Sequence, residues 1–247
     1  MVKPDRCEIA KELYWGKGRR PKPPDRLALE LFAGLAERSD AMLDIGAYTG
    51  IFTLAGTGVN ARLAAHAFEI VPEVFDVLRE NCERNDVSAR TTLHLAGVGS
   101  PGDTMRVPAS TGGSALPSYY SSSTRFAEGV EVEFVSLDSL LEIVPAAAEV
   151  VVKIDVEGTE DAVFRHGQEF LAALKPDILC EVLAGTANAG ELERLLSPHG
   201  YELYLVRDDD LLPLTSLRPD ARFRDWLFTT RDAEEVAEIG IPIAGGD

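Results

Sequence analysis

In the stretch "VVVKIDVEGTED", residues 150–161, an apolar run is followed at once by four carboxylates, at Asp155, Glu157, Glu160 and Asp161. Valine and isoleucine fit a strand that is buried on both faces of a sheet. A buried core does not hold unpaired carboxylates, because taking them out of water costs too much free energy. We therefore expect this strand to end in a site that uses negative charge.

Other predicted strands also carry a carboxylate at or near their ends. Asp44 lies in "MLDIG", Glu69 ends "HAFE" and Glu181 ends "ILCE". The carboxyl ends of parallel strands meet at one edge of an open sheet, where ligands and catalytic groups lie. We expect Asp155, Glu157 and Glu181 to line one crevice as catalytic residues.

The segment "MLDIGAYTGIFTLAG" is a candidate cofactor loop, because a strand ends in Asp44, Gly46 and Gly50 before a helical pattern. Glycines allow a tight turn close to a ligand, and the helix start offers free amides. The dinucleotide fingerprint would need a further glycine at Tyr48. Asp44 suits an amino-acid ammonium and Glu69 suits ribose hydroxyls, so the pair indicates a nucleoside-plus-amino-acid ligand.

Several carboxylates at one crevice also suit a divalent metal such as Mg²⁺, with Asp155 and Glu181 as the first candidates. An equally strong alternative is that these acids bind the hydroxyls of a sugar-like acceptor. Glu160 and Asp161 have a structural explanation, because acids in the first turn of a helix stabilise its dipole. Asp44 has one too, as a cap of the glycine loop.

From residue 41 onward, short apolar runs alternate with amphipathic stretches, which predicts an α/β fold around a mostly parallel sheet. We expect seven strands, with helices on both faces. The candidate strands are "AMLDIG", "LAAHAFEI", "TTLHLAGV", "EVVVKIDV", "DILCEVL", "YELYLVR" and "DWLFTT".

Three segments flank or interrupt this pattern. Residues 1–40 contain two helical patterns around "RRPKPPD", and we expect an N-terminal arm or lid over the ligand edge of the sheet. The main domain is predicted at 41–235, with a polar insertion at 99–136 that suits an acceptor lid and includes Tyr119 and Tyr120. Residues 236–247 form a C-terminal tail.

The composition is that of an ordinary globular protein with one large core, since 45% of the 247 residues are hydrophobic. The net charge of −17 repels phosphate backbones and anionic lipids, so we expect neither nucleic acid nor a membrane as a partner. The three widely spaced cysteines predict free thiols and a cytoplasmic location. A small-molecule acceptor and a homo-oligomer both remain open.

The motifs "LDIGAYTGIFT", "AFEIVPEVFDVLREN", "TGGSAL", "VEFVSLDSLL", "VVKIDVEGTEDAVFRHG", "PDILCEV" and "WLF" stand in one order along the chain. In this respect the sequence resembles the FkbM-type S-adenosylmethionine-dependent methyltransferases, roughly over residues 41–230. The glycine loop alone is a generic methyltransferase signal, whereas "KIDVEGTE" together with "FEIVPE" is more specific.

The resemblance implies a Rossmann-like class I methyltransferase fold, a seven-stranded sheet with an antiparallel last strand. It places S-adenosylmethionine across the carboxyl ends of the first strands. Asp44, Gly46 and Gly50 would hold the methionine end, Glu69 the ribose, and Gly97 would lie near the adenine. The other implied cofactor-binding residues are Tyr48, Thr49, Ile70 and Asp155.

We therefore expect an O-methyltransferase that acts on a hydroxyl of a small molecule, of glycosyl or polyketide type in secondary metabolism. One alternative is a nicotinamide-dependent oxidoreductase, against which the incomplete glycine fingerprint counts. Another is a non-catalytic module that binds S-adenosylmethionine. The acids at the ends of the predicted strands favour an active site over such a module.

Overall fold

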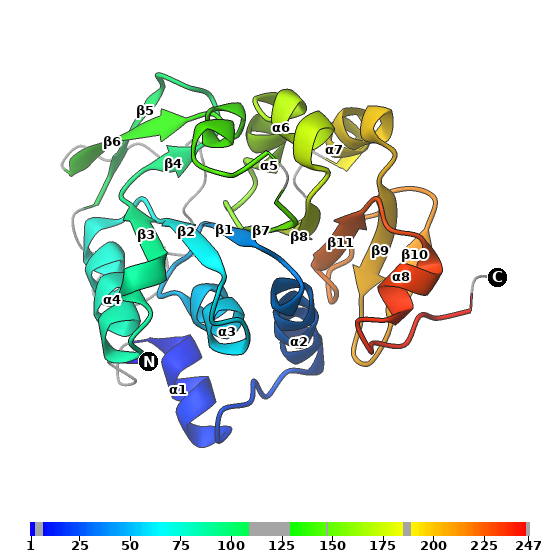
Figure 1. Cartoon of the computed structure of the whole chain (residues 1–247), viewed down its shortest axis with the longest axis horizontal. Coiled ribbons are helices and arrows are strands. Elements are labelled where there is room, and N and C mark those ends of the chain that lie inside the picture. Colours follow the sequence, from blue (N-terminus) through cyan, green and yellow to red (C-terminus); the bar gives the residue numbers. More distant parts are fainter. Residues whose placement is uncertain (3–6, 109–128, 147, 185–188, 246–247) are drawn as a thin grey trace.

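The computed structural model describes residues 1–2, 7–108, 129–146, 148–184 and 189–245. Within these residues a sheet of eight strands forms the centre (Figure 1). Its strands lie in the order β10 (Leu211–Leu214), β9 (Glu202–Val206), β11 (Asp225–Thr229), β8 (Asp177–Glu181), β7 (Val150–Ile154), β1 (Ala41–Ile45), β2 (Ala64–Phe68) and β3 (Thr91–His94).

The predicted α/β class is confirmed, and so is the antiparallel last strand. Strands β3, β2, β1, β7 and β8 pair in parallel, while β11 runs antiparallel to both β8 and β9. The expected count of seven strands is wrong by one, because β10 turns back antiparallel against β9. The run "LLPL" that forms β10 is too short, and interrupted by Pro213, to stand out as a strand in the sequence.

Helices cover both faces of the sheet (Figure 1). One face carries α2 (Pro23–Glu37), α3 (Ile51–Val59), α4 (Pro72–Arg84) and α8 (Ala233–Ala237). The opposite face carries α5 (Glu160–Arg165), α6 (Gln168–Leu174) and α7 (Ala189–Leu196). Short 3-10 helices span Ser88–Arg90, Asp138–Glu142 and Ser197–His199.

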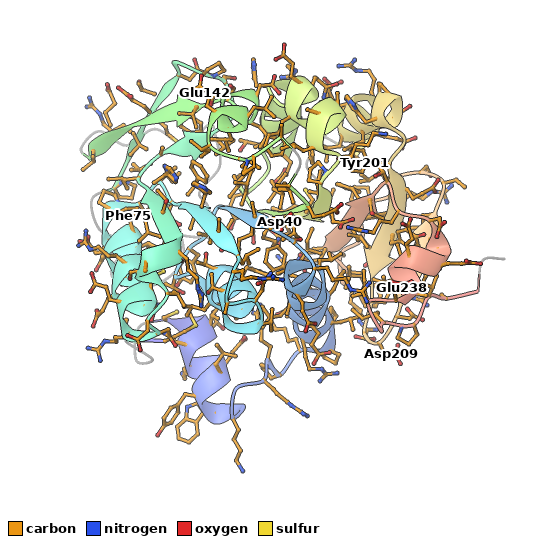
Figure 2. The ribbon with its side chains drawn as sticks, in the orientation of Figure 1. Asp40, Phe75, Glu142, Tyr201, Asp209 and Glu238 are labelled. Atoms are coloured by element: carbon orange, nitrogen blue, oxygen red, sulfur yellow. The ribbon has the colours of Figure 1, made fainter. Side chains whose placement is uncertain are left out.

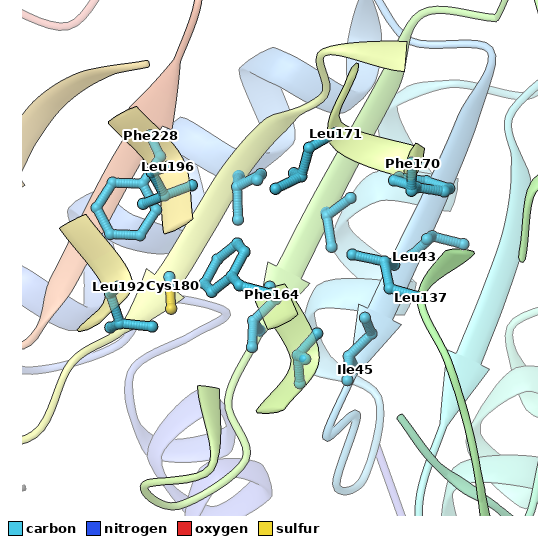
Figure 3. Packing of buried hydrophobic residues seen from close by; sticks show 14 of the residues in the cluster. Leu43, Ile45, Leu137, Phe164, Phe170, Leu171, Cys180, Leu192, Leu196 and Phe228 are labelled. Carbon is cyan, nitrogen blue, oxygen red and sulfur yellow. The ribbon is translucent and has the colours of Figure 1, made fainter. Parts of the chain in front are cut away.

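Successive strand residues point to opposite faces, and this period of two divides the core into two layers. Leu43 and Ile45 of β1 pack into the layer under α5, α6 and α7, whereas Met42 packs under α2. Figure 3 shows Leu43 and Ile45 on β1 together with Phe164 and Phe170 from the covering helices. The layers place the ends of the central strands at one common edge.

A smaller sheet lies beside the main one, which the sequence did not predict as a separate unit. It consists of β4 (Gly97–Val98), β6 (Val130–Val135) and β5 (Thr104–Val107), in that order. The run "TTLHLAGV", expected as one strand, is therefore split between β3 and β4. Part of the predicted insertion 99–136 is sheet, while Tyr119, Tyr120 and "TGGSAL" lie outside the described residues.

The first forty residues form two helices, as the sequence indicates, but they differ in their packing. Helix α1 (Glu8–Trp15) projects from the body in Figure 1, and Tyr14 and Trp15 are exposed. In α2, Leu31 and Phe32 are fully buried against the sheet. None of the described helices has the length and apolar character needed to cross a bilayer.

Charged side chains gather on the outside of the molecule. Figure 2 shows Glu142, Asp209 and Glu238 at its periphery, and all three are exposed. Asp177, at the start of β8, is an exception, because it is 4% exposed. It accepts hydrogen bonds from Thr229 Oγ1 at 2.5 Å and from Arg231 Nε at 2.9 Å, which join β8 to β11.

Replacement of Arg231 tests this contact between β8 and β11. Arg231→Met leaves the buried Asp177 carboxylate without its cation, so we expect the free energy of unfolding to fall by about 1–3 kcal/mol. Arg194→Met is the control, because Arg194 pairs with Glu191 at the surface, and it should cost less than about 1 kcal/mol. Urea denaturation measures both, and an equal loss in the two variants would contradict this role of Arg231.

Candidate active site

A cavity of about 510 Å³ lies at the carboxyl ends of the central strands. Glu69 and Ile70 follow β2, Gly46 follows β1 and Asp155 follows β7, and all four line it. Helices α1 and α2 close another side of the cavity with polar residues. The volume lies within the range of about 300–1,000 Å³ that is common for small-molecule sites.

Gly46 allows β1 and β7 to meet at this edge. Its φ is +80°, and a Cβ built on it would lie 1.8 Å from the carbonyl oxygen of Asp155. Tyr48, which also lines the cavity, has a positive φ of 50° that side chains rarely adopt. Only glycine fits at position 46, because the backbone of the loop packs directly against the backbone of Asp155.

Hydrogen bonding to the backbone fixes the Glu69 carboxylate at the part of the cavity where the cofactor is expected. It is 7% exposed, and its Oε1 accepts a hydrogen bond from the Val71 amide at 2.7 Å. Burial raises the pKa of Glu69 to about 7, although the amides of Val71, Ile70 and Tyr48 act in the opposite direction. The backbone thus fixes the carboxylate at the end of β2, where it faces the cavity.

The wall beyond Glu69 is mainly apolar. Ile70 and Gly97 line the cavity together with Phe68, Val74 and Phe134, while the cofactor contacts of Ile70 and Gly97 stay predictions. A Cβ at position 97 would lie 2.4 Å from the ring of Phe134, so glycine leaves room for this ring. Such a wall suits the flat face of a nucleobase.

Asp44, Thr49 and Gly50 do not line the cavity. The Asp44 carboxylate accepts hydrogen bonds from Thr53 N at 2.9 Å and Thr53 Oγ1 at 2.6 Å, at the start of α3. Burial raises its pKa to about 6, and its Oδ1 has no partner among the described residues. Thr49 and Gly50 belong to the same loop but lie outside the cavity lining. A ligand role for Asp44, Thr49 and Gly50 therefore stays a prediction.

The three predicted catalytic carboxylates, Asp155, Glu157 and Glu181, do come together, because each lines the cavity. Burial raises the pKa of Glu181, and the neighbouring Asp155 carboxylate adds to this effect. Glu157 is exposed, and its φ of 54° places it in the left-handed region. The structure therefore supports a shared location for these residues, while their catalytic roles remain predictions.

Lys153 lies among these carboxylates, and the motif reasoning missed it. Its Nζ is 3.3 Å from Asp225 Oδ1 and 3.8 Å from Asp155 Oδ2, and it donates to the Ile154 carbonyl at 3.2 Å. It is 1% exposed. Burial lowers the pKa of Lys153, but the carboxylates of Asp225, Asp155 and Glu181 outweigh burial and raise the pKa above its ordinary value.

A lysine inside the run "VVVKI" was a readable signal, because lysine is almost never fully buried unless it is paired. Arg224 and Asp225 were missed as well, and they bring charge from the start of β11. Arg224 Nη1 lies 3.0 Å from Glu181 Oε1.

No group of three or more metal-ligating side chains is present in the described part of the chain, so the metal role considered for Asp155 and Glu181 has no support here.

The N-terminal helices contribute a second set of residues that the sequence did not identify. Glu8, Ile9 and Glu12 of α1 line the cavity. Arg20 lies 3.0 Å from both Glu12 and Asp25, and this ion-pair bridge links α1 to α2. The cavity lining therefore includes residues of both N-terminal helices, while the role of residues 1–40 as an arm or lid and the boundary at residue 40 stay predictions.

Two of the acids with a structural explanation make local contacts. Glu160 is 1% exposed, and its Oε1 accepts from the Gly158 amide at 3.0 Å. Asp161 pairs with Arg165 of the same helix at 3.1 Å. Both acids therefore stabilise the turn into α5.

The sequence matches the Methyltransferase FkbM domain over residues 44–203, most of the chain. The protein belongs to the FkbM methyltransferase family. Among solved structures, methyltransferase FkbM from Methylobacillus flagellatus KT is similar, with a TM-score of 0.52 and 19% identity, over 78% of this chain and 44% of that one. This chain thus corresponds to less than half of that protein, and the likeness shows the fold.

A second solved structure is a putative caffeoyl-CoA O-methyltransferase from Staphylococcus aureus, at a TM-score of 0.49 and 10% identity, over 90% of this chain and 91% of that one. No curated protein matches the sequence.

Membership of the FkbM family implies S-adenosylmethionine as the methyl donor. The cavity fits this group, because it has the volume of a small-molecule site and places the Glu69 carboxylate beside the apolar residues Ile70 and Val74.

Gly46→Ala tests the close contact between the cofactor loop and β7. The added methyl would collide with the Asp155 carbonyl, so we expect affinity for S-adenosylmethionine to fall at least about tenfold. Gly58→Ala is the control, because a Cβ at position 58 meets nothing within 4 Å. Calorimetric titration measures the affinities, and unchanged binding in Gly46→Ala would refute the proposed loop geometry.

Glu69→Gln tests the raised pKa of Glu69. Because the folded-state pKa of about 7 exceeds the ordinary 4.5, the stability contributed by this group is complete below about pH 4.5 and is lost as pH rises through 7. The variant lacks this loss. Its stability relative to wild type should therefore increase by about 2 kcal/mol between pH 5 and pH 8.

The pH-independent effect of replacing a carboxylate by an amide cancels in that comparison. Denaturant unfolding at the two pH values provides the measurement. Glu142→Gln, at an exposed position, is the matched control and should show no such pH dependence. The same result for both variants would rule out Glu69 as the source.

Proposed function

We propose that this FkbM-family protein is an O-methyltransferase that methylates a hydroxyl of a small molecule, of glycosyl or polyketide type. The observation that supports it most is the position of Asp155 at the end of β7, where its side chain lines the cavity and is 35% exposed. The carboxylate is thus accessible to an acceptor. S-adenosylmethionine, when bound, would supply an electrophilic methyl group.

The residues at the cavity would have separate tasks. Glu69 would accept hydrogen bonds from the ribose hydroxyls, the loop around Gly46 would hold the methionine end, and the wall with Ile70 and Gly97 would lie against the adenine. Asp155 would accept the proton of the acceptor hydroxyl through a carboxylate oxygen. Such a base adds only part of the rate, because alignment of the reacting atoms supplies much of it.

Glu181 and Glu157 would bind other hydroxyls of the acceptor. Glu181 is held by Arg224, so its carboxylate has a fixed direction. Residues Glu8, Ile9 and Glu12 of α1 would cover the bound acceptor and keep water away from the reacting atoms. This arrangement favours a polar acceptor with several hydroxyls, in line with the carboxylates that line the cavity.

The first experiment is calorimetric titration of the protein with S-adenosylmethionine, its demethylated product and NAD. We expect binding of the first two and no heat from NAD. Binding of NAD alone would replace the proposal with an oxidoreductase. Binding of the S-adenosyl ligands without methyl transfer to any of a panel of glycosides, polyketides and amines would favour a non-catalytic module, and transfer to amines alone would refute the O-directed reaction.

Asp155→Asn tests the role of the carboxylate in turnover. We expect kcat to fall about 100-fold or more, because the amide cannot accept the hydroxyl proton. Affinity for the demethylated product should change by less than about threefold, since Glu69 and the glycine loop remain. Asp161→Asn is the control, because Asp161 lies outside the cavity lining; equal kcat in the two variants would refute the base.

A further inference from the structure

The ammonium of Lys153 occupies the centre of the carboxylate cluster formed by Asp155, Asp225 and Glu181. Its Nζ lies within 3.8 Å of a carboxylate oxygen of Asp155 and within 3.3 Å of one of Asp225. The ring of Phe52 on α3 lies under the ammonium, 5.2 Å from Nζ to the ring centroid. The ammonium thus contacts carboxylates on one side and the face of an aromatic ring on the other, and these contacts hold it in place.

The sheet itself creates this arrangement. In β7, Lys153 follows Val151 on the face covered by α2 and α3, and Asp155 comes two residues later. In β8 and β11, Glu181 and Asp225 lie two residues from Leu179 and Leu227, on the same face. Since side chains two residues apart share a face, the charged groups converge just beyond the apolar layer.

The exposed fraction of the side chain differs among the members of the cluster. The Lys153 side chain is 2% exposed, that of Asp225 18% and that of Asp155 35%. Lys153, Asp155 and Asp225 all line the cavity, but the cation is the least exposed of the three and Asp155 is the most exposed. A ligand reaches Asp155 without displacing Lys153.

We propose that Lys153 is a positioning residue that acts as the built-in cation of this active site and excludes a divalent metal from the carboxylates around it. A metal bound by these carboxylates would need oxygens at about 2.0–2.6 Å, and the fixed ammonium would repel it. The ammonium opposes the burial that raises the pKa values of Glu181 and Asp225, and so favours carboxylates that accept a proton from the acceptor. This inference rests on the proposed methyl transfer only for that last step.

Other charged groups also face the cluster and belong to its titration. Asp44 lies on β1 beside Lys153, Glu160 begins α5 and Asp25 comes from α2, while Arg224 neutralises Glu181. Acids already outnumber bases in this group, and removal of the buried ammonium increases that excess. The remaining carboxylates would then take up a proton at higher pH, or bind a cation from solution.

Lys153→Met and Lys153→Arg separate this role from a merely structural one. In Lys153→Met, the acid limb of the kcat profile should move up by about 1–3 pH units. In Lys153→Arg the charge remains, so the limb should stay in place even where the rate falls. Lys175→Met, at an exposed lysine far along the chain, is the control. An unmoved limb in Lys153→Met would overturn the proposal.

Metal binding gives a readout that needs no methyl transfer. Calorimetric titration with Mn²⁺ should show no binding to wild type or Lys153→Arg, and binding at least about tenfold tighter to Lys153→Met. Binding of Mn²⁺ at the cluster of the wild-type protein, lost in Asp155→Asn, would overturn the built-in cation even where methyl transfer is confirmed. Absence of methyl transfer, with this binding pattern intact, would instead refute only the proposed function.

Wild type alone supplies a further check in case Lys153→Met fails to fold. Turnover of protein treated with a chelator should equal that of untreated protein. A loss of turnover that is restored by Mg²⁺ or Mn²⁺ would show that the site requires a metal and would overturn the proposal.

Discussion

A buried ion pair between one lysine and several carboxylates determines the character of the ligand edge. Removing either sign alone would leave uncompensated charge in a place with little water. Lys153 belongs to β7 and Asp225 begins β11, so their ion pair also joins these two strands. The chemistry of the edge and the cohesion of the sheet at that point therefore depend on the same contact.

The two helices at the N-terminus link the fold to the site in different ways. Helix α2 is part of the core, since Leu31 and Phe32 have no exposed surface. Helix α1 makes fewer contacts with the body, among them the 3.5 Å approach of Cys7 Sγ to Thr49 Oγ1. The cavity thus has a floor formed by the sheet and one wall formed by α1, which Arg20 links to α2.

Much of the fold was predictable because it depends on periodicity. The alternation of apolar strands and amphipathic helices predicts the parallel core, and acids at strand ends predict that Asp155, Glu157 and Glu181 share one crevice. Strand β10 escaped because its short sequence has neither feature. The division of "TTLHLAGV" between two sheets depends on contacts with β6, which is distant in the sequence.

The candidate site was predictable where one residue type has one main use, and less so where neighbours decide. A carboxylate beside a glycine loop suits both a ligand contact and a helix cap, and for Asp44 the contact in the structure is with Thr53. Lys153 was not predicted, because its partner Asp225 is 72 residues away in the sequence and only the fold brings the two together. The arm residues Glu8 and Glu12 had no motif at all, since only the path of α1 brings them to the cavity.

The positive φ of Glu157 limits which substitutions this protein can accept at that position. A left-handed φ costs a residue with a side chain about 1–2 kcal/mol, and glycine would avoid that cost. The chain nevertheless has a carboxylate at this point on the rim of the cavity, next to Gly158, whose φ is also positive. A substitution to glycine that stabilises this turn would therefore also remove a negative charge from the rim of the cavity, so that stability and the charge of the site compete at one position.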